Sequence, residues 1–227
     1  MSRTLVYCGF RRAPELALPA VGVNGAPVQV ASFDDLRLLW SEVEWPFDSQ
    51  RMQKSAVEFH EVVHQVFRQT AVIPFRLLSV FDDQQAFTAF AAENREGFLK
   101  DLERLKDFVQ MECVTYPKPS ETPVDRSSGK AYLEQKAVAL RSSAEVVQAT
   151  QDAVAHVSRE FRVREGKNGT RIFVLVERGR EGDFRQAVTA MPIPMHLSRR
   201  ISGPWPAAEF LSEQVKVPQM DGVAGPK

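Results

Sequence analysis

The segment from His60 to His64 reads His-Glu-Val-Val-His and carries the residue types and spacing of a zinc-hydrolase motif. Histidines four residues apart project from one face of a helix and can share a metal ion, while the glutamate between them can activate a metal-bound water. Residues 50–69 have the apolar spacing of a helix, which is the local structure that this chemistry requires. One hypothesis is therefore a zinc-dependent hydrolase with His60 and His64 as ligands.

Other features of the sequence argue against a catalytic metal site. A pattern this short arises by chance in roughly one chain of this composition in two hundred. The helical phase places His60 in an apolar stripe with Val63 and Phe67, where a packed core histidine is expected. No third histidine follows at metalloprotease spacing, and nothing singles out Glu93 or Glu96 as a third ligand. We therefore predict that His60 and His64 form no catalytic zinc site, and we predict no cofactor.

Other catalytic templates do not fit the sequence. It contains no Walker loop, no dinucleotide-binding glycine motif after a strand and no G-x-S-x-G elbow. Residues 166–169, Gly-Lys-Asn-Gly, have the composition of a phosphate loop but lack its spacing and its following helix. We predict a hairpin turn there.

The charges of the chain are balanced. Of 227 residues, 29 are Lys or Arg and 29 are Asp or Glu, so the formal net charge at pH 7 is +0. Nucleic-acid binders and polybasic membrane-surface proteins concentrate cationic residues, so we expect neither nucleic acid nor a lipid membrane as a partner. No apolar run approaches the roughly 20 residues of a membrane span. Cys8 and Cys113 lie in apolar runs without metal or redox spacing, which predicts buried thiols in a cytoplasmic protein.

The elements that position these residues begin with a mixed α+β region. Asp34-Asp35 separates two apolar runs and predicts a hairpin. Pro74 within a later run predicts a strand start, an edge or a bulge. We expect strands at residues 4–10, 28–33, 36–43 and 71–80, and helices at residues 50–69 and 82–105.

The second half of the chain has the element order of a ferredoxin-like fold. We expect strands at residues 108–116, 161–164, 170–177 and 195–202, and helices at residues 128–161 and 183–190. This βαββαβ order predicts an antiparallel sheet with two helices on one face. The predicted fold class is α+β with two domains and a tail: an N-terminal mixed α+β domain at 1–106, a ferredoxin-like C-terminal domain at 107–211 and a flexible tail at 212–227.

A proline-flanked tryptophan follows the last expected strand. Pro204 and Pro206 fix the backbone on either side of Trp205, and Phe210 follows. A tryptophan in this position can cover the end of a sheet with a large apolar area. We predict that Trp205 is largely buried and holds the C-terminal segment against the second domain; the alternative is a structural corner with no binding role.

The same residues carry a resemblance to a known family. Ser202-Gly203-Pro204-Trp205-Pro206 with Phe210 resembles the C-terminal hallmark of the gas vesicle GvpF/GvpL family, S-G-P-W-P-P-Y-x-F. Three further segments are similar in order and spacing, and the resemblance spans residues 4–211. They are His60 with Val62-Val63 followed by Val72-Ile73-Pro74-Phe75-Arg76, then Gly129-Lys130-Ala131-Tyr132-Leu133, and Phe173-Val174-Leu175-Val176 before Phe184.

The chain departs from the family pattern at two places. Ala207 and Ala208 stand where the family has Pro-Tyr, and Leu77-Leu78-Ser79 stands where it has F-G-T. The sequence is either a divergent member or a member adapted to a different partner, and whether the changes at Leu78, Ala207 and Ala208 alter function stays open.

The resemblance implies a role in gas vesicles and not an enzyme. Members of the family are accessory or minor structural proteins that are thought to bind the small hydrophobic shell protein and other accessory proteins during vesicle assembly. It also implies a two-domain α+β fold with a ferredoxin-like C-terminal part and a location at the gas vesicle in the cytoplasm. The implied partner-binding or structural residues are Gly203, Pro204, Trp205, Pro206, Phe210, Pro74, Arg76 and Tyr132.

Three hypotheses from different classes follow from the sequence. The favoured one is a gas vesicle assembly or minor structural protein that binds the shell protein or other accessory proteins through an exposed apolar surface or a strand edge. The alternatives are the zinc-dependent hydrolase and a ferredoxin-like module that binds a small ligand. The sequence leaves the oligomeric state and the binding surface open.

Overall fold

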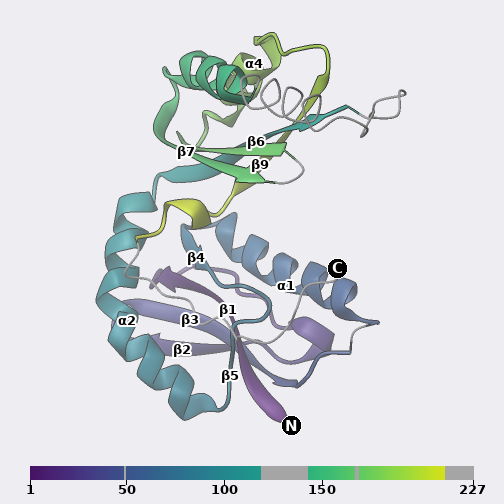
Figure 1. The fold of residues 1–227 in the computed structure, drawn as a ribbon. Helices are drawn as coiled ribbons and strands as arrows, with labels where there is room; N and C mark the ends of the chain where they lie inside the picture. The colour runs from purple at the N-terminus through teal and green to yellow at the C-terminus, as the bar shows by residue number, and fades with distance from the viewer. Residues whose placement is uncertain (49, 119–142, 167–168, 213–227) are drawn as a thin grey trace. The chain divides into compact units, whose positions relative to one another are not determined.

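The chain forms two compact units in a computed structural model that describes residues 1–48, 50–118, 143–166 and 169–212 (Figure 1). The first unit consists of Met1–Asp107 together with the segment that begins at Pro206. The second unit is Phe108–Trp205. Each unit contains one antiparallel sheet with helices, so the expected α+β class is confirmed.

The sheet of the first unit has the strand order β2-β3-β1-β4, with β5 also paired to β1. The expected hairpin is present, because β2 pairs antiparallel with β3 across Asp34, which adopts a positive φ of 52°. The strands are β1 (Ser2–Arg11), β2 (Gln29–Phe33), β3 (Leu36–Glu44), β4 (Val72–Pro74) and β5 (Val80–Phe81).

The single strand expected at residues 71–80 is wrong, because β4 and β5 are two short strands separated by a turn. Pro74 lacks a backbone N–H and ends β4. In the turn, the backbone N–H of Arg76 donates to Ser79 Oγ (3.1 Å) and the backbone N–H of Ser79 donates to the Arg76 carbonyl (2.8 Å). The chain thus leaves the sheet after β4 and returns to pair with β1 at β5.

Helices α1 (Met52–Phe67) and α2 (Gln84–Leu105) lie on opposite faces of this sheet (Figure 1). Trp40 and Ser41 are neighbours on β3 and therefore point to opposite faces. The Trp40 ring packs on Phe87 of α2 at 6.1 Å, whereas Ser41 accepts a hydrogen bond from Tyr7, whose ring lies 5.2 Å from Phe59 of α1. Both faces of the sheet are thus covered by apolar side chains.

The second unit has the ferredoxin-like topology that the sequence predicted. Its sheet has the order β7-β8-β6-β9 with every neighbouring pair antiparallel. Residues 143–154 are helical, and together with α4 they pack on the face that carries Met111, Cys113 and Val174. The elements are β6 (Phe108–Pro117), β7 (Ser158–Gly166), β8 (Gly169–Glu177), α4 (Glu181–Ala190) and β9 (Leu197–Trp205).

The expected helix at residues 128–161 is too long at its C-terminal end. The described helical residues end at 154, and β7 begins at Ser158. Phe161 and Val163 of β7 pair with β8 at Val174 and Ile172. Residues 128–142 lie outside the described part of the chain.

The chain returns to the first unit after β9. The sequence assigned residues 206–211 to the second domain, but in the structure this segment groups with the first unit. Phe210, in the short helix η2 (Ala208–Phe210), is fully buried, and its carbonyl accepts a hydrogen bond from Arg104 of α2. The backbone N–H of Ser212 donates to Asp101 Oδ2 of the same helix at 2.8 Å. The segment is therefore anchored on α2.

Candidate functional site

The histidine pair lies on the outward-facing side of α1. His60 is exposed and His64 is half-buried, and their rings stack with centroids 5.5 Å apart and planes inclined by 17°. The expectation that His60 lies inside the apolar stripe is wrong. The buried stripe of α1 is shifted by one residue from the predicted one. The residues that face the sheet are Phe59, Val62, Val63, Val66 and Phe67.

The third zinc ligand considered from the sequence is not available to this pair. Glu93 and Glu96 belong to α2, which packs on the other face of the sheet from α1. Among the residues that the structure describes, no group of three or more His, Cys, Asp or Glu side chains is close enough to hold a metal ion. Burial and the neighbouring charges of Arg68 and His60 lower the pKa of His64. The described pair therefore offers two imidazoles on one helix.

The proline-flanked tryptophan ends β9 in a corner that only glycine can form. Gly203 has a φ of 110°, and a Cβ atom there would lie 2.8 Å from the carbonyl oxygen of Gln110 on β6. The peptide bond between Gly203 and Pro204 is cis. Trp205 is half-buried, with the smaller part of its surface exposed, and Ala207 and Phe210 that follow it are buried. That Trp205 holds the C-terminal segment against the second domain stays a prediction.

A carboxylate that the sequence analysis missed organises the side chains around this corner. Glu112 on β6 is 7% exposed and accepts from Arg171 Nε at 2.6 Å and from Ser202 Oγ at 3.0 Å. The indole N–H of Trp205 donates to the same Ser202 hydroxyl at 3.2 Å. The guanidinium of Arg171 also lies 5.2 Å from the ring centre of Phe173. A charged residue between Met111 and Cys113 in an apolar strand was the signal available in the sequence.

The remaining residues implied by the family resemblance are distributed over both units. Pro74 is half-buried at the end of β4, and Arg76 is exposed in the turn that follows; both belong to the first unit. Gly203, Pro204 and Trp205 belong to the second unit. Tyr132 lies outside the described residues. The motif that contains Trp205 thus spans the boundary between the units, because Pro206 and Phe210 group with the first unit.

Among the described strands, three of the four sheet edges carry features that discourage pairing with another chain. Edge strands avoid such pairing through charges, prolines and short length. The edge formed by β4 and β5 is short and contains Pro74, and β9 carries Pro204 and two arginines, Arg199 and Arg200. Strand β7 carries five charged residues, Arg159, Glu160, Arg162, Arg164 and Glu165.

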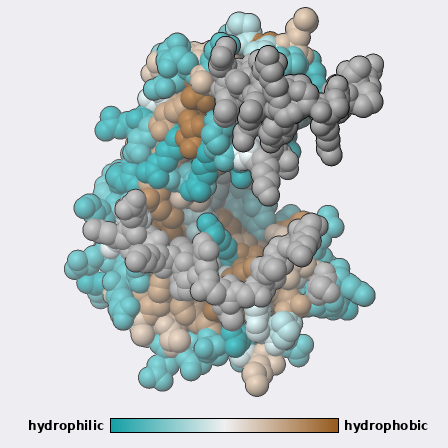
Figure 2. All heavy atoms as spheres, viewed as in Figure 1, coloured by the Kyte–Doolittle hydropathy of each residue, from teal (hydrophilic) through white to brown (hydrophobic). Residues whose placement is uncertain are grey.

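The outer edge of β2 differs from the other three. Its five residues, Gln-Val-Ala-Ser-Phe, include no charge and no proline, and Val30 is 44% exposed. Strand β2 ends the strand order, with β3 as its described neighbour. Figure 2 shows hydrophilic residues over much of the visible face, with apolar residues gathered in smaller areas among them. The β2 edge is therefore the best-formed candidate for a main-chain contact with another protein.

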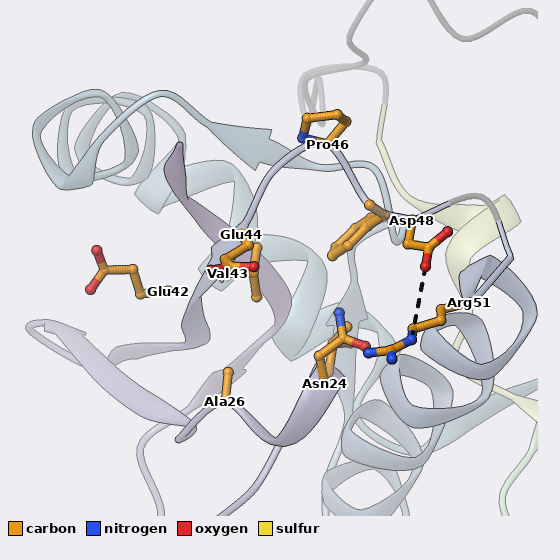
Figure 3. Close-up of a pocket in the computed structure, with 10 residues that line it drawn as sticks. Asn24, Ala26, Glu42, Val43, Glu44, Pro46, Asp48 and Arg51 are labelled. Atoms are coloured by element: carbon orange, nitrogen blue, oxygen red, sulfur yellow. Dashed lines mark ion pairs between the residues drawn. The ribbon is translucent and has the colours of Figure 1, made fainter.

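A pocket in the first unit lies between the end of β3 and the start of α1 (Figure 3). It has a volume of about 370 Å³, and an ion pair of 3.8 Å between Arg51 and Asp48 lies in its wall. The carboxylate of Glu42 points away from the other labelled side chains and accepts a hydrogen bond from Ser2. The lining does not bring a nucleophile, a base and an oxyanion donor together, so the described pocket lacks the arrangement expected of a catalytic site.

Comparisons with known proteins converge on one family. The family model described as "Gas vesicle synthesis protein GvpL/GvpF" matches residues 3–212. No curated protein matches the chain. Two crystal structures of the gas vesicle protein GvpF share the fold, each with a TM-score of 0.74. The one from Anabaena sp. PCC7120 is 13% identical, and the match covers 93% of this chain and 97% of that chain. The one from Microcystis aeruginosa is 14% identical, and the match covers 92% and 99%.

Proposed function

The chain belongs to the GvpL/GvpF family of gas vesicle synthesis proteins, and we propose that it acts in gas vesicle formation by binding the small hydrophobic shell protein or another accessory protein of the vesicle. The observation that carries this proposal is the family match over residues 3–212. The shared fold over nearly the full length of both GvpF structures supports it. We place the protein at the gas vesicle.

We assign the main contact to the outer edge of β2. An extended segment of a partner can add to an exposed edge through backbone hydrogen bonds, and the side chains on the edge strand then select the partner. Because β2 has no charge and Val30 is exposed, the edge favours an uncharged, apolar segment over a charged one. This chemistry agrees with a small hydrophobic shell protein as the partner.

We propose a second contact at the corner formed by Gly203, Pro204 and Trp205, called here the glycine-proline corner. Pro204 is exposed and Trp205 is half-buried, so part of each side chain is accessible to another protein. The hydrogen bond from Trp205 to Ser202, which is held in turn by Glu112, restricts the orientation of the indole. A preorganised aromatic side chain binds with a smaller loss of conformational entropy.

We propose a binding role and no enzymatic activity for this protein. The description of the family names gas vesicle synthesis. The proposed contacts use backbone edges and apolar side chains, and they involve no chemical step. Among the described residues, none of the helices is long and apolar enough to cross a membrane.

The proposal is tested by co-purification with each product of a neighbouring gas vesicle gene cluster. The wild-type chain is expected to retain the shell protein or an accessory protein, and the complex is expected to survive a rise in salt from about 0.1 to about 0.5 M, because apolar contacts are not screened by ions. Recovery of none of these proteins, together with normal vesicles after deletion of the gene, would show that the assembly role is wrong.

The β2 edge is tested by Val30→Lys with Val163→Lys as the matched control. Both valines are exposed edge-strand residues, at 44% and 39%, but Val163 lies on the charged strand β7. We expect Val30→Lys to weaken partner binding by about tenfold or more, because a lysine on the edge opposes strand addition. Both variants should keep the stability within about 0.5 kcal/mol of wild type, as surface substitutions do. Equal binding by the two variants would exclude the β2 edge.

A further inference from the structure

The exposed face of α1 holds two imidazoles that lie outside the stripe packed on the sheet. His60 and His64 are one helical turn apart, and their rings lie 5.5 Å apart and nearly parallel. Neither ring belongs to the buried stripe that packs α1 on the sheet. Two side chains at this spacing on a helix face the same solvent region.

The separation of the rings is close to that of two histidines that share one metal ion. With metal–nitrogen bonds of about 2.0–2.1 Å, the centroids of two imidazoles on one ion lie about 4.5–5.5 Å apart, depending on the angle at the metal. The observed 5.5 Å falls at the upper end of this range, but the rings are stacked with planes inclined by 17°, and a shared ion must lie in the plane of both. Each side chain must therefore turn about its χ angles to direct one nitrogen at a common ion. We propose that His60 and His64 form a two-imidazole binding site for a divalent transition-metal ion.

The chemistry of the pair indicates which ions it selects. Imidazole nitrogen suits Ni²⁺, Cu²⁺ and Zn²⁺, whereas Mg²⁺ and Ca²⁺ prefer oxygen ligands. Because the described residues offer no third His, Cys, Asp or Glu, water completes the coordination. The site binds a metal ion without forming the three-ligand centre of a zinc hydrolase.

Metal binding at this place would brace the helix that covers one face of the first sheet. A single ion bonded to His60 and His64 links two successive turns of α1, whose Phe59 packs on Tyr7 of the sheet. Any ion that binds the folded helix better than the unfolded chain stabilises the first unit by mass action. This site goes beyond the proposed vesicle function and does not depend on it.

The site is tested by calorimetric titration of nickel chloride into the untagged, metal-free full chain. We expect one Ni²⁺ per chain, and a loss of affinity of about tenfold or more in His60→Ala and in His64→Ala, because the second bond of a chelate is intramolecular. Magnesium chloride should give no binding at this site. In the presence of a chelator, both alanine variants should have the helix content and melting temperature of wild type, because both histidine side chains reach the surface.

Two controls separate a paired site from the mere presence of histidine. His64→Ala combined with Gln65→His keeps four histidines in the chain but moves the second imidazole off the shared face, so it should bind as weakly as His64→Ala. His156→Ala with His196→Ala should bind as tightly as wild type. Wild-type affinity in the shifted pair, or loss of binding in the His156 and His196 variant, would overturn the proposal.

Discussion

The two sheets differ in what they leave accessible. In the first unit, α1 and α2 cover both faces, and the uncharged backbone edge of β2 lies at the end of the sheet. In the second unit, α4 and residues 143–154 pack on one face, the opposite face carries Glu112, and the edge strand β7 is charged. The first unit is thus suited to recognition through an edge and the second to recognition through side chains.

The largest effect on stability is expected when a buried aromatic side chain is removed from the first unit. Phe87 is fully buried, and its ring lies within 6.2 Å of the rings of Phe33, Trp40 and Phe81. We expect Phe87→Ala to lower the free energy of unfolding of the first unit by about 3–5 kcal/mol, as for other aromatic truncations in a core.

The two buried cysteines report on each unit separately. Burial raises the pKa of the Cys113 thiol to about 11 and also raises the pKa of the Cys8 thiol, so the native protein presents almost no thiolate at pH 8. In the Phe87→Ala variant, a thiol-specific reagent should modify Cys8 at least about a hundredfold faster than in wild type. Cys113 should react at the wild-type rate. Equal acceleration of both thiols would show that the units unfold together.

A smaller effect is expected from the polar face of the second sheet. Glu112→Ala removes the acceptor of Arg171 and Ser202 and should cost about 1.5–3 kcal/mol, the range for hydrogen bonds to charged groups. Glu177→Ala on β8 is the matched control, because Glu177 is exposed, and it should stay within about 0.5 kcal/mol. Urea denaturation measures both. If the two variants are equally stable, Glu112 does not organise this face.

The smallest effect is expected at the tryptophan of the glycine-proline corner. Because Trp205 is half-buried, Trp205→Ala should lower the free energy of unfolding by about 1–2 kcal/mol, less than a fully buried aromatic. Phe210→Ala, which truncates a fully buried ring, should cost more in the same urea experiment. A loss for Trp205→Ala that equals the loss for Phe210→Ala would show that the tryptophan is a core residue.

Elements with strong local patterns could be predicted from the sequence. The Asp34-Asp35 turn predicted the hairpin, because these residues favour a tight turn between two apolar runs. The order of strands and helices after Phe108 predicted the ferredoxin-like topology, because few topologies suit that order. Ala71 to Val80 was predicted as one strand, because local β-propensity does not reveal that Ser79 closes a turn onto Arg76.

The candidate site was less predictable, because its contacts join distant segments. A shift of one residue in helical phase decides whether His60 faces the core or solvent, and the periodicity of α1 fits both phases. The bonds of Glu112 reach Arg171 and Ser202, which are 59 and 90 residues away in the sequence. The single charge in β6 marked an unusual position, but only the pairing of β6 with β8 and β9 shows which groups satisfy it.

The return of the chain to the first unit makes the ferredoxin-like unit an insertion. It begins at Phe108 and ends at Trp205, so the chain passes between the units twice. Entry and exit are neighbours, because Gln110 near the start of β6 pairs with Trp205 at the end of β9. A short linker from Asp107 to Pro206 can therefore close the gap left by excision of the whole insertion, and a foreign domain with adjacent termini can be grafted at the same point.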